Sequence, residues 1–202
     1  MADATLDRVL DVISVALHPQ RAFVERVASR PRRAAAGIVL ASGLLAGGIS
    51  AVSTAIEPIA AADRSAGYAF SITLPVLFVA FWVIDATIVD AVAQLMGAPS
   101  RLRAWTAASA HAIPFLLVFE LIRLGQALLD RAGAVDVSTG VGFVEFAVIA
   151  WFVWMLSNGV RALYDLPMFS AISAALAPGA AMMTVLLVLL LVATGLHIAG
   201  AG

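Results

Sequence analysis

The chain has no cysteine and no lysine, so every basic side chain apart from histidine is an arginine. The absence of cysteine excludes disulfides and thiolate metal ligands. Charged residues make up only 12% of the chain, and the net charge of -1 by itself indicates nothing about partners, whereas the distribution of the charges does. The missing lysine fits a GC-rich genome, and together with the missing cysteine and targeting signal it favours a bacterial chain.

What fills the sequence instead is apolar: 62% of the residues are hydrophobic and the mean hydropathy is +1.01. A bilayer core about 30 Å thick needs roughly 20 apolar residues per helix. We therefore predict an all-α, polytopic membrane helix bundle over residues 34–202, with about five transmembrane helices. The predicted spans are about 34–56, 68–96, 104–128, 141–163 and 178–198.

Two features inside these spans predict how the helices pack. Gly43, Gly47 and Ala51 form a stripe of small residues that lets another helix approach closely. Pro178 lies within the last apolar run and is expected to kink it, so that residues 168–177 lie along the membrane interface before the helix turns inward.

Residues 1–33 predict a cytoplasmic amphipathic helical segment that is not a cleavable signal. Residues 3–17 place apolar side chains at helical spacing, with acidic ones on the opposite face. Pro19 begins a second short helix, which is basic. We expect the first helix to dock on protein and the second to lie against anionic headgroups; a solvated cap is the alternative. The residues expected to contact headgroups are Arg21, Arg26, Arg30, Arg32 and Arg33.

The distribution of arginine predicts the orientation in the membrane. Arginines of short loops remain in the cytoplasm. One side of the predicted spans carries Arg8, Arg21, Arg26, Arg30, Arg32, Arg33, Arg101, Arg103 and Arg161. The other side carries only Arg64 and Arg131. We therefore expect a bacterial inner (plasma) membrane protein with a cytoplasmic N-terminus and an outward C-terminus.

Polar residues within spans are costly and need a partner or a function. If successive spans cross the membrane in opposite directions, four polar residues fall in its cytoplasmic half. We call them the inner polar cluster: Asp85, His111, Asn158 and, at its edge, Asp90. Asp85 and Asp90 are separated by roughly 140° around a helix, so they do not form one site alone, and Asp90 is near enough to the span's end to reach headgroups. A proton or ion relay through Asp85 and His111 is one interpretation, and an interhelical hydrogen bond is the other.

A second cluster is expected in the outward half of the membrane. Glu120 and Arg123 are three residues apart, so they share a helix face and can neutralise each other. Glu145 is a second possible partner for this arginine. We interpret the three residues as a structural ion pair within the bundle.

Searches for catalytic and cofactor motifs find little. His18, His111 and His197 lie far apart without zinc-binding spacing, and no phosphate-binding glycine loop occurs. Ser157 before Asn158 lacks the glycine expected of an intramembrane serine protease, and Asp85 with Asp90 does not supply a lipid-transfer motif. No catalytic, cofactor or metal site is predicted.

Three stretches carry a family resemblance. They are His18-Pro19 with Phe23 and Pro31; Leu74-Pro75, Leu95 to Gly97, Ser100-Arg101 and Ala110 to Pro114; and Trp151 to Tyr164 followed by Ser170-Ala171. Their order and spacing over nearly the whole chain resemble the Yip family, the Ypt/Rab-interacting membrane proteins, in its bacterial branch. The chain lacks the long N-terminal extension of the eukaryotic relatives, which bind small GTPases.

The resemblance implies a five-span membrane protein with a cytoplasmic N-terminal region and no catalytic activity. The leading hypothesis is thus a non-enzymatic protein that organises lipid or partner proteins. The alternative is a small transporter or channel-like subunit that uses the inner polar cluster, and an enzyme acting on lipid comes third. The expected partners are the lipid bilayer and either other membrane proteins or a second copy of the chain, with no nucleic acid.

Overall fold

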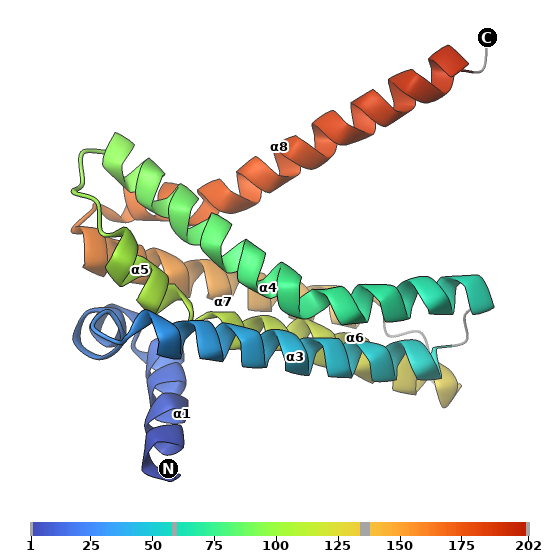
Figure 1. Cartoon of the computed structure of the whole chain (residues 1–202), viewed down its shortest axis with the longest axis horizontal. Helices are drawn as coiled ribbons and strands as arrows, with labels where there is room; N and C mark the ends of the chain where they lie inside the picture. Colours follow the sequence, from blue (N-terminus) through green and yellow to red (C-terminus); the bar gives the residue numbers. More distant parts are fainter. Residues whose placement is uncertain (1, 58–59, 134–137, 201–202) are drawn as a thin grey trace.

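The computed structural model describes residues 2–57, 60–133 and 138–200, and every regular element in these ranges is a helix (Figure 1). The elements in chain order are α1 (Ala2–Leu17), α2 (Pro19–Arg21), the π-helix η1 (Ala22–Val27), α3 (Arg32–Ile56), α4 (Ala61–Leu95), α5 (Leu102–Ser109), the 3-10 helix η2 (Ile113–Leu116), α6 (Leu117–Arg131), α7 (Ser138–Tyr164) and α8 (Met168–Gly200).

The apolar runs form helices long enough to cross a bilayer. Within the described ranges α3, α4, α7 and α8 each meet this length and hydropathy, which makes 4 candidate spans. The pair Leu102–Ser109 and Ile113–Arg131 adds a fifth if its bent halves are one crossing. The predicted all-α membrane helix bundle is thereby confirmed.

The bent pair has a local cause at Pro114. A proline has no N–H and its ring clashes with the carbonyl four residues earlier, so it interrupts an α-helix. Here α5 ends at Ser109, Pro114 sits in the first turn of η2, and the two halves meet at 43°. The turn between them holds His111, whose Nδ1 lies 3.1 Å from the Ala107 carbonyl oxygen.

Small residues bring α3 and α4 into close contact. A Cβ at position 43 would lie 2.7 Å from the Cα of Pro75, and one at position 47 would lie 2.6 Å from the carbonyl oxygen of Ser71. The Ser71 hydroxyl donates to Ser50 Oγ at 3.1 Å across the same interface. Pro75 lies inside α4, which changes direction near its middle (Figure 1).

The last helix contains Pro178, where the sequence predicts a kink between an interfacial piece and a span. α8 runs unbroken through Pro178, and Ala171, Ala174 and Ala175 are buried in the same apolar cluster as residues of α4 and α7. Residues 168–177 are therefore held against protein by apolar packing. Beyond them the helix diverges from the bundle, and its apolar side chains from Met182 to Val192 are exposed (Figure 1).

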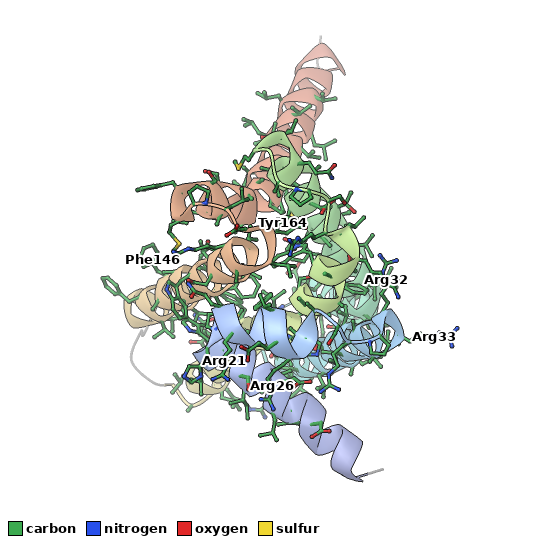
Figure 2. The ribbon with its side chains drawn as sticks, turned by 90° about the vertical axis from the view of Figure 1, so that its left-hand side faces the viewer. Arg21, Arg26, Arg32, Arg33, Phe146 and Tyr164 are labelled. Atoms are coloured by element: carbon green, nitrogen blue, oxygen red, sulfur yellow. The ribbon has the colours of Figure 1, made fainter. Side chains whose placement is uncertain are left out.

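All the N-terminal elements gather at one end of the bundle, which we call the arginine-rich end. The start of α3, the end of α4, α5, the end of α7 and the start of α8 meet there (Figure 1). In the end-on view, Arg32 and Arg33 lie on the side opposite Phe146 and point outward (Figure 2). Arg21 and Arg26 lie on the N-terminal segment (Figure 2). α1 runs across the direction of α3 (Figure 1).

Candidate functional site

The arginine-rich end is organised around the carboxylate of Asp90, a residue of α4 that is only 3% exposed. The Tyr164 hydroxyl and the Arg101 backbone N–H each donate to Oδ1 at 2.7 Å. Ser100 Oγ and Gln94 Nε2 each donate to Oδ2 at 2.8 Å. Four donors satisfy both oxygens, which is how a protein keeps a buried carboxylate without a cationic partner.

The turn after α4 delivers two of these donors. Gly97 has a φ of +91°, in the left-handed region that glycine enters without steric cost. The Ala98 N–H donates to the Ala93 carbonyl at 3.0 Å, which closes a helix C-terminus of the Schellman type. The chain is thereby turned back so that residues 100 and 101 face Asp90 on the helix they have just left.

Three aromatic rings connect Asp90 to the N-terminal segment. Phe23 of η1 stacks on Trp105 of α5, with centroids 5.6 Å apart, and Trp105 meets Tyr164 edge-on at 6.3 Å. All three rings are buried, and Tyr164 lies among the helices in the end-on view (Figure 2). Since such ring pairs contribute about 0.5–1.5 kcal/mol beyond their burial, the rings join η1, α5 and α7 into one packed unit.

The N-terminal segment also contacts α7 directly. A Cβ on Gly159 would lie 2.7 Å from Phe23 Cε1, so the ring rests against the bare backbone of α7. One turn before Phe23, Gln20 Nε2 donates to Asn158 Oδ1 at 2.8 Å. Asn158, next to Gly159, donates from Nδ2 to the Trp154 carbonyl. We call this set of contacts, together with Asp90, Trp105 and Tyr164, the junction.

A buried acid holds α1 against the segment that follows it. Asp11 is 1% exposed, and its Oδ2 accepts from Arg30 Nε at 2.9 Å while Oδ1 lies 3.7 Å from Arg26 Nε. Arg26 also donates to Ser14 Oγ at 2.7 Å. The two helical pieces are therefore joined through charge, with the second one packed into the bundle by Phe23 and Val27.

The arginines of the segment have different partners within the protein. Arg26 and Arg30, two of those predicted to contact headgroups, face Asp11 because the acidic helix folds back on the basic one, and their side chains are 49% and 40% exposed. Arg21 pairs with Glu25 at 2.6 Å, and this hydrogen bond raises the pKa of the Arg21 guanidinium. Arg32 and Arg33 are exposed at the start of α3 (Figure 2).

The predicted inner cluster is divided among separate partners. Asp90, for which the sequence left contact with headgroups open, is buried and accepts a hydrogen bond from the Tyr164 hydroxyl. Asn158 pairs with Gln20, and His111, in the turn after α5, contacts the Ala107 carbonyl of that helix. Asp85 is 7% exposed and has no hydrogen-bond partner among the described residues. The structure thus brings Asp90 and Asn158 into the junction but forms no bond from Asp85 to His111.

In the cluster predicted for the outward half of the membrane, Arg123 also pairs with a different residue than expected. Arg123 Nε donates to Glu57 Oε1 at 3.1 Å, not to Glu120 or Glu145. Glu120 Oε2 is buried without a hydrogen-bond partner in the described part of the chain. Glu57 was missed because it lies at the end of the first predicted span, 66 residues before Arg123, where no local spacing connects them.

Sequence reasoning also missed Gln20, Trp105 and Tyr164 as members of the site. A tyrosine at the end of an apolar span, as Tyr164 is, favours the membrane boundary. Near a buried aspartate on another span it is also a candidate hydrogen-bond donor, and this is the signal that could have found it. No group of three His, Cys, Asp or Glu side chains that could hold a metal occurs within the described ranges. Chemically, the junction is a set of packed rings and hydrogen bonds, in which the Trp105 indole N–H is buried without a hydrogen-bond partner among the described residues.

Comparison with protein families supplies the identification. The fold and the junction define a multi-pass membrane protein built from packed helices. The family model described as the Yip1 domain matches residues 13–190, which begins within α1 and includes every junction residue. The chain belongs to the Yip family. No curated protein and no solved structure matches the chain.

Proposed function

We propose that the chain is a non-enzymatic membrane protein of the Yip type that organises lipid or partner proteins at the membrane surface through its N-terminal segment. The membrane is taken to be a bacterial inner membrane, with the N-terminus in the cytoplasm and the C-terminus outside. The arginine-rich end supports this orientation because positive loops are retained in the cytoplasm.

The observation that carries the proposal is the way α1 is held. Its polar side is fixed through Asp11 to Arg30, while Val9, Leu10, Ile13 and Leu17 are each more than 40% exposed. The helix lies across the spans (Figure 1), so its exposed apolar stripe runs along the plane of the membrane surface. An apolar stripe in that plane is what an interfacial helix offers to lipid or to another helix.

Photocrosslinking from position 13 tests the proposal in cells. The wild-type chain should give crosslinks from this position to lipid or to a membrane protein. Asp11→Asn removes the charge that holds α1 to Arg30, so those crosslinks should fall severalfold. Asp7→Asn, on an exposed position of the same helix, is the control and should leave them unchanged. Absence of any crosslink, combined with unaltered membrane composition after deletion of the protein, would contradict the proposal.

A small transporter or channel-like subunit is the second candidate, favoured by one observation. Asp85 is buried within a span and has no hydrogen-bond partner in the part of the chain the structure describes. Unpaired carboxylates inside a membrane often mark an ion or proton path. Proton or cation flux into proteoliposomes that disappears in Asp85→Asn and in His111→Ala would favour this candidate, and flux that persists in both would remove these residues from it.

A further inference from the structure

A recess of about 360 Å³ lies between the N-terminal segment and α7. It is lined by Leu17, His18, Pro19, Gln20, Arg21, Trp154 and Asn158. Two of these lining residues are joined by a hydrogen bond, which Gln20 donates to Asn158. The lining is amphipathic, because it combines the Arg21 guanidinium and the His18 imidazole with the side chains of Leu17 and Trp154, which are 63% and 45% exposed.

Two further hollows share lining residues with this recess. One of about 330 Å³ shares His18 and Arg21 with it and adds Arg26, and another of about 400 Å³ shares Gln20 and adds Arg161. The carboxylates in these two hollows are Glu25 and Asp165, and none lines the central recess itself. Arg21 therefore lines a central recess without an acid, and Arg26 and Arg161 line the two hollows that share residues with it.

The ion pair between Arg21 and Glu25 does not close the site to an anion. Its side chains are 79% and 55% exposed, and exposed pairs of this kind contribute little because water and salt screen them. A phosphate can therefore take over the guanidinium by a charge-assisted, bidentate contact. Arg161 has no ion pair with any described residue, so its guanidinium is free for the same purpose.

The order of side chains along α7 matches a lipid better than a water-soluble anion. Asn158 and Arg161 follow Trp154 by four and seven residues, so the three lie on one face of the helix. Seven residues rise about 10 Å, which is comparable to a headgroup layer of roughly 5–8 Å on each side of a bilayer. Tryptophan prefers the edge of the hydrocarbon and arginine the phosphates, so the face runs from acyl chain to headgroup.

We infer that this recess binds an anionic phospholipid, with the phosphate between Arg21 and Arg161 and the first acyl carbons against Trp154 and Leu17. The inference deepens the proposed function, on which it rests, by naming the lipid class that the N-terminal segment recognises. A partner protein crosslinked from position 13 would remain a finding even if the recess bound no lipid, so the two proposals fail separately.

Native mass spectrometry of the full-length chain in mild detergent tests the inference. Phosphatidylglycerol, phosphatidylcholine and glycerol phosphate are titrated separately. The wild type should retain phosphatidylglycerol in preference to the other two. Arg21→Gln with Arg161→Gln should weaken that binding about tenfold, because each arginine near anionic headgroups contributes to it. Arg33→Gln with Arg103→Gln removes the same charge from exposed positions outside the recess and should change binding less than twofold.

Each other outcome overturns the inference. An equal loss in both double variants would mean that only the overall charge of this end matters. Binding of glycerol phosphate as tight as that of phosphatidylglycerol would make the recess a site for a soluble anion. Quenching of Trp154 by brominated phosphatidylglycerol, measured against Trp154→Phe, places the lipid independently of affinity; no Trp154-dependent quenching would exclude this recess.

Discussion

Asp85 and Asp90 are buried on the same helix, five residues apart, yet their carboxylates are in opposite situations. Asp90 accepts four hydrogen bonds, and Asp85 accepts none from the described residues. Burial costs both groups the hydration they have in water. Only Asp90 has that loss compensated, so the two residues differ in what they contribute to stability.

Asp90→Asn and Asp85→Asn therefore form a matched pair. An asparagine at position 90 turns an amide toward groups that are themselves donors, so the free energy of unfolding should fall by about 1.5–3 kcal/mol. The same change at position 85 removes an uncompensated charge and should leave that free energy unchanged or raise it. Denaturant titration in mixed micelles measures both. An equal loss in the two variants would contradict the assignment of Asp90 as the organising residue.

Gly159 is the second residue whose identity the junction requires. Phe23 is fully buried between this glycine and Trp105, so its ring cannot move away from an added methyl group. Gly159→Ala should destabilise the chain by about 1–3 kcal/mol through overpacking. Gly142→Ala, in the same helix with open space around it, is the control and should be neutral or slightly stabilising.

The same unfolding titration gives a second check on Gly159. In a Phe23→Ala background the added methyl group has room, so the cost of Gly159→Ala should largely disappear. If the two substitutions were strictly additive, the ring would not be resting on the glycine.

At the scale of elements, the pairing of α3 with α4 depends on small residues. Position 47 faces the Ser71 carbonyl at a distance that allows no side chain, whereas position 48 faces open space. Gly47→Ala should separate the two helices and lower the unfolding free energy by about 1–3 kcal/mol. Gly48→Ala should preserve or increase it, because alanine has the higher helix propensity. A thermal unfolding series in detergent compares the neighbours; equal midpoints would mean that the contact is not tight.

The crossing count is a property of the whole molecule, and the bent pair of α5 with η2 and α6 decides it. Five crossings place the two chain ends on opposite sides of the membrane, and four place them on the same side. Because the chain has no cysteine, single substitutions report accessibility without background. A thiol reagent that does not cross membranes should label Arg131→Cys in intact cells and not Arg33→Cys. Labelling of both from outside would exclude a cytoplasmic N-terminal segment.

Much of the element arrangement could be predicted from the sequence, because lipid imposes its demands locally. Each apolar run had to be helical, since an unpaired backbone group in hydrocarbon is costly. The stripe at Gly43 and Gly47 predicted a close helix contact, which the packing of α3 on α4 confirms. The resemblance carried by His18-Pro19 and by Trp151 to Tyr164 led to the Yip family, of which the chain is a member.

The candidate site was less predictable, since it depends on contacts between distant segments. The sequence indicated that His111 and Asn158 are buried polar residues, but it did not indicate which groups they contact. The charges of α1 were assigned to protein and those of the next helix to lipid, whereas Asp11 and Arg30 bind each other. The reason is that a short amphipathic helix has two possible partners, and its own pattern does not distinguish them.

Hydrophobicity and arginine placement, both local properties, were sufficient by themselves to determine a helical membrane protein with one strongly basic end. Only the tertiary structure decided which polar groups pair: Asp90 with Tyr164, 74 residues away, and Arg123 with Glu57. Such pairs depend on how far each helix is rotated and how deeply it lies against its neighbours. That geometry is set by the packing of all the helices together, so no single stretch of sequence contains it.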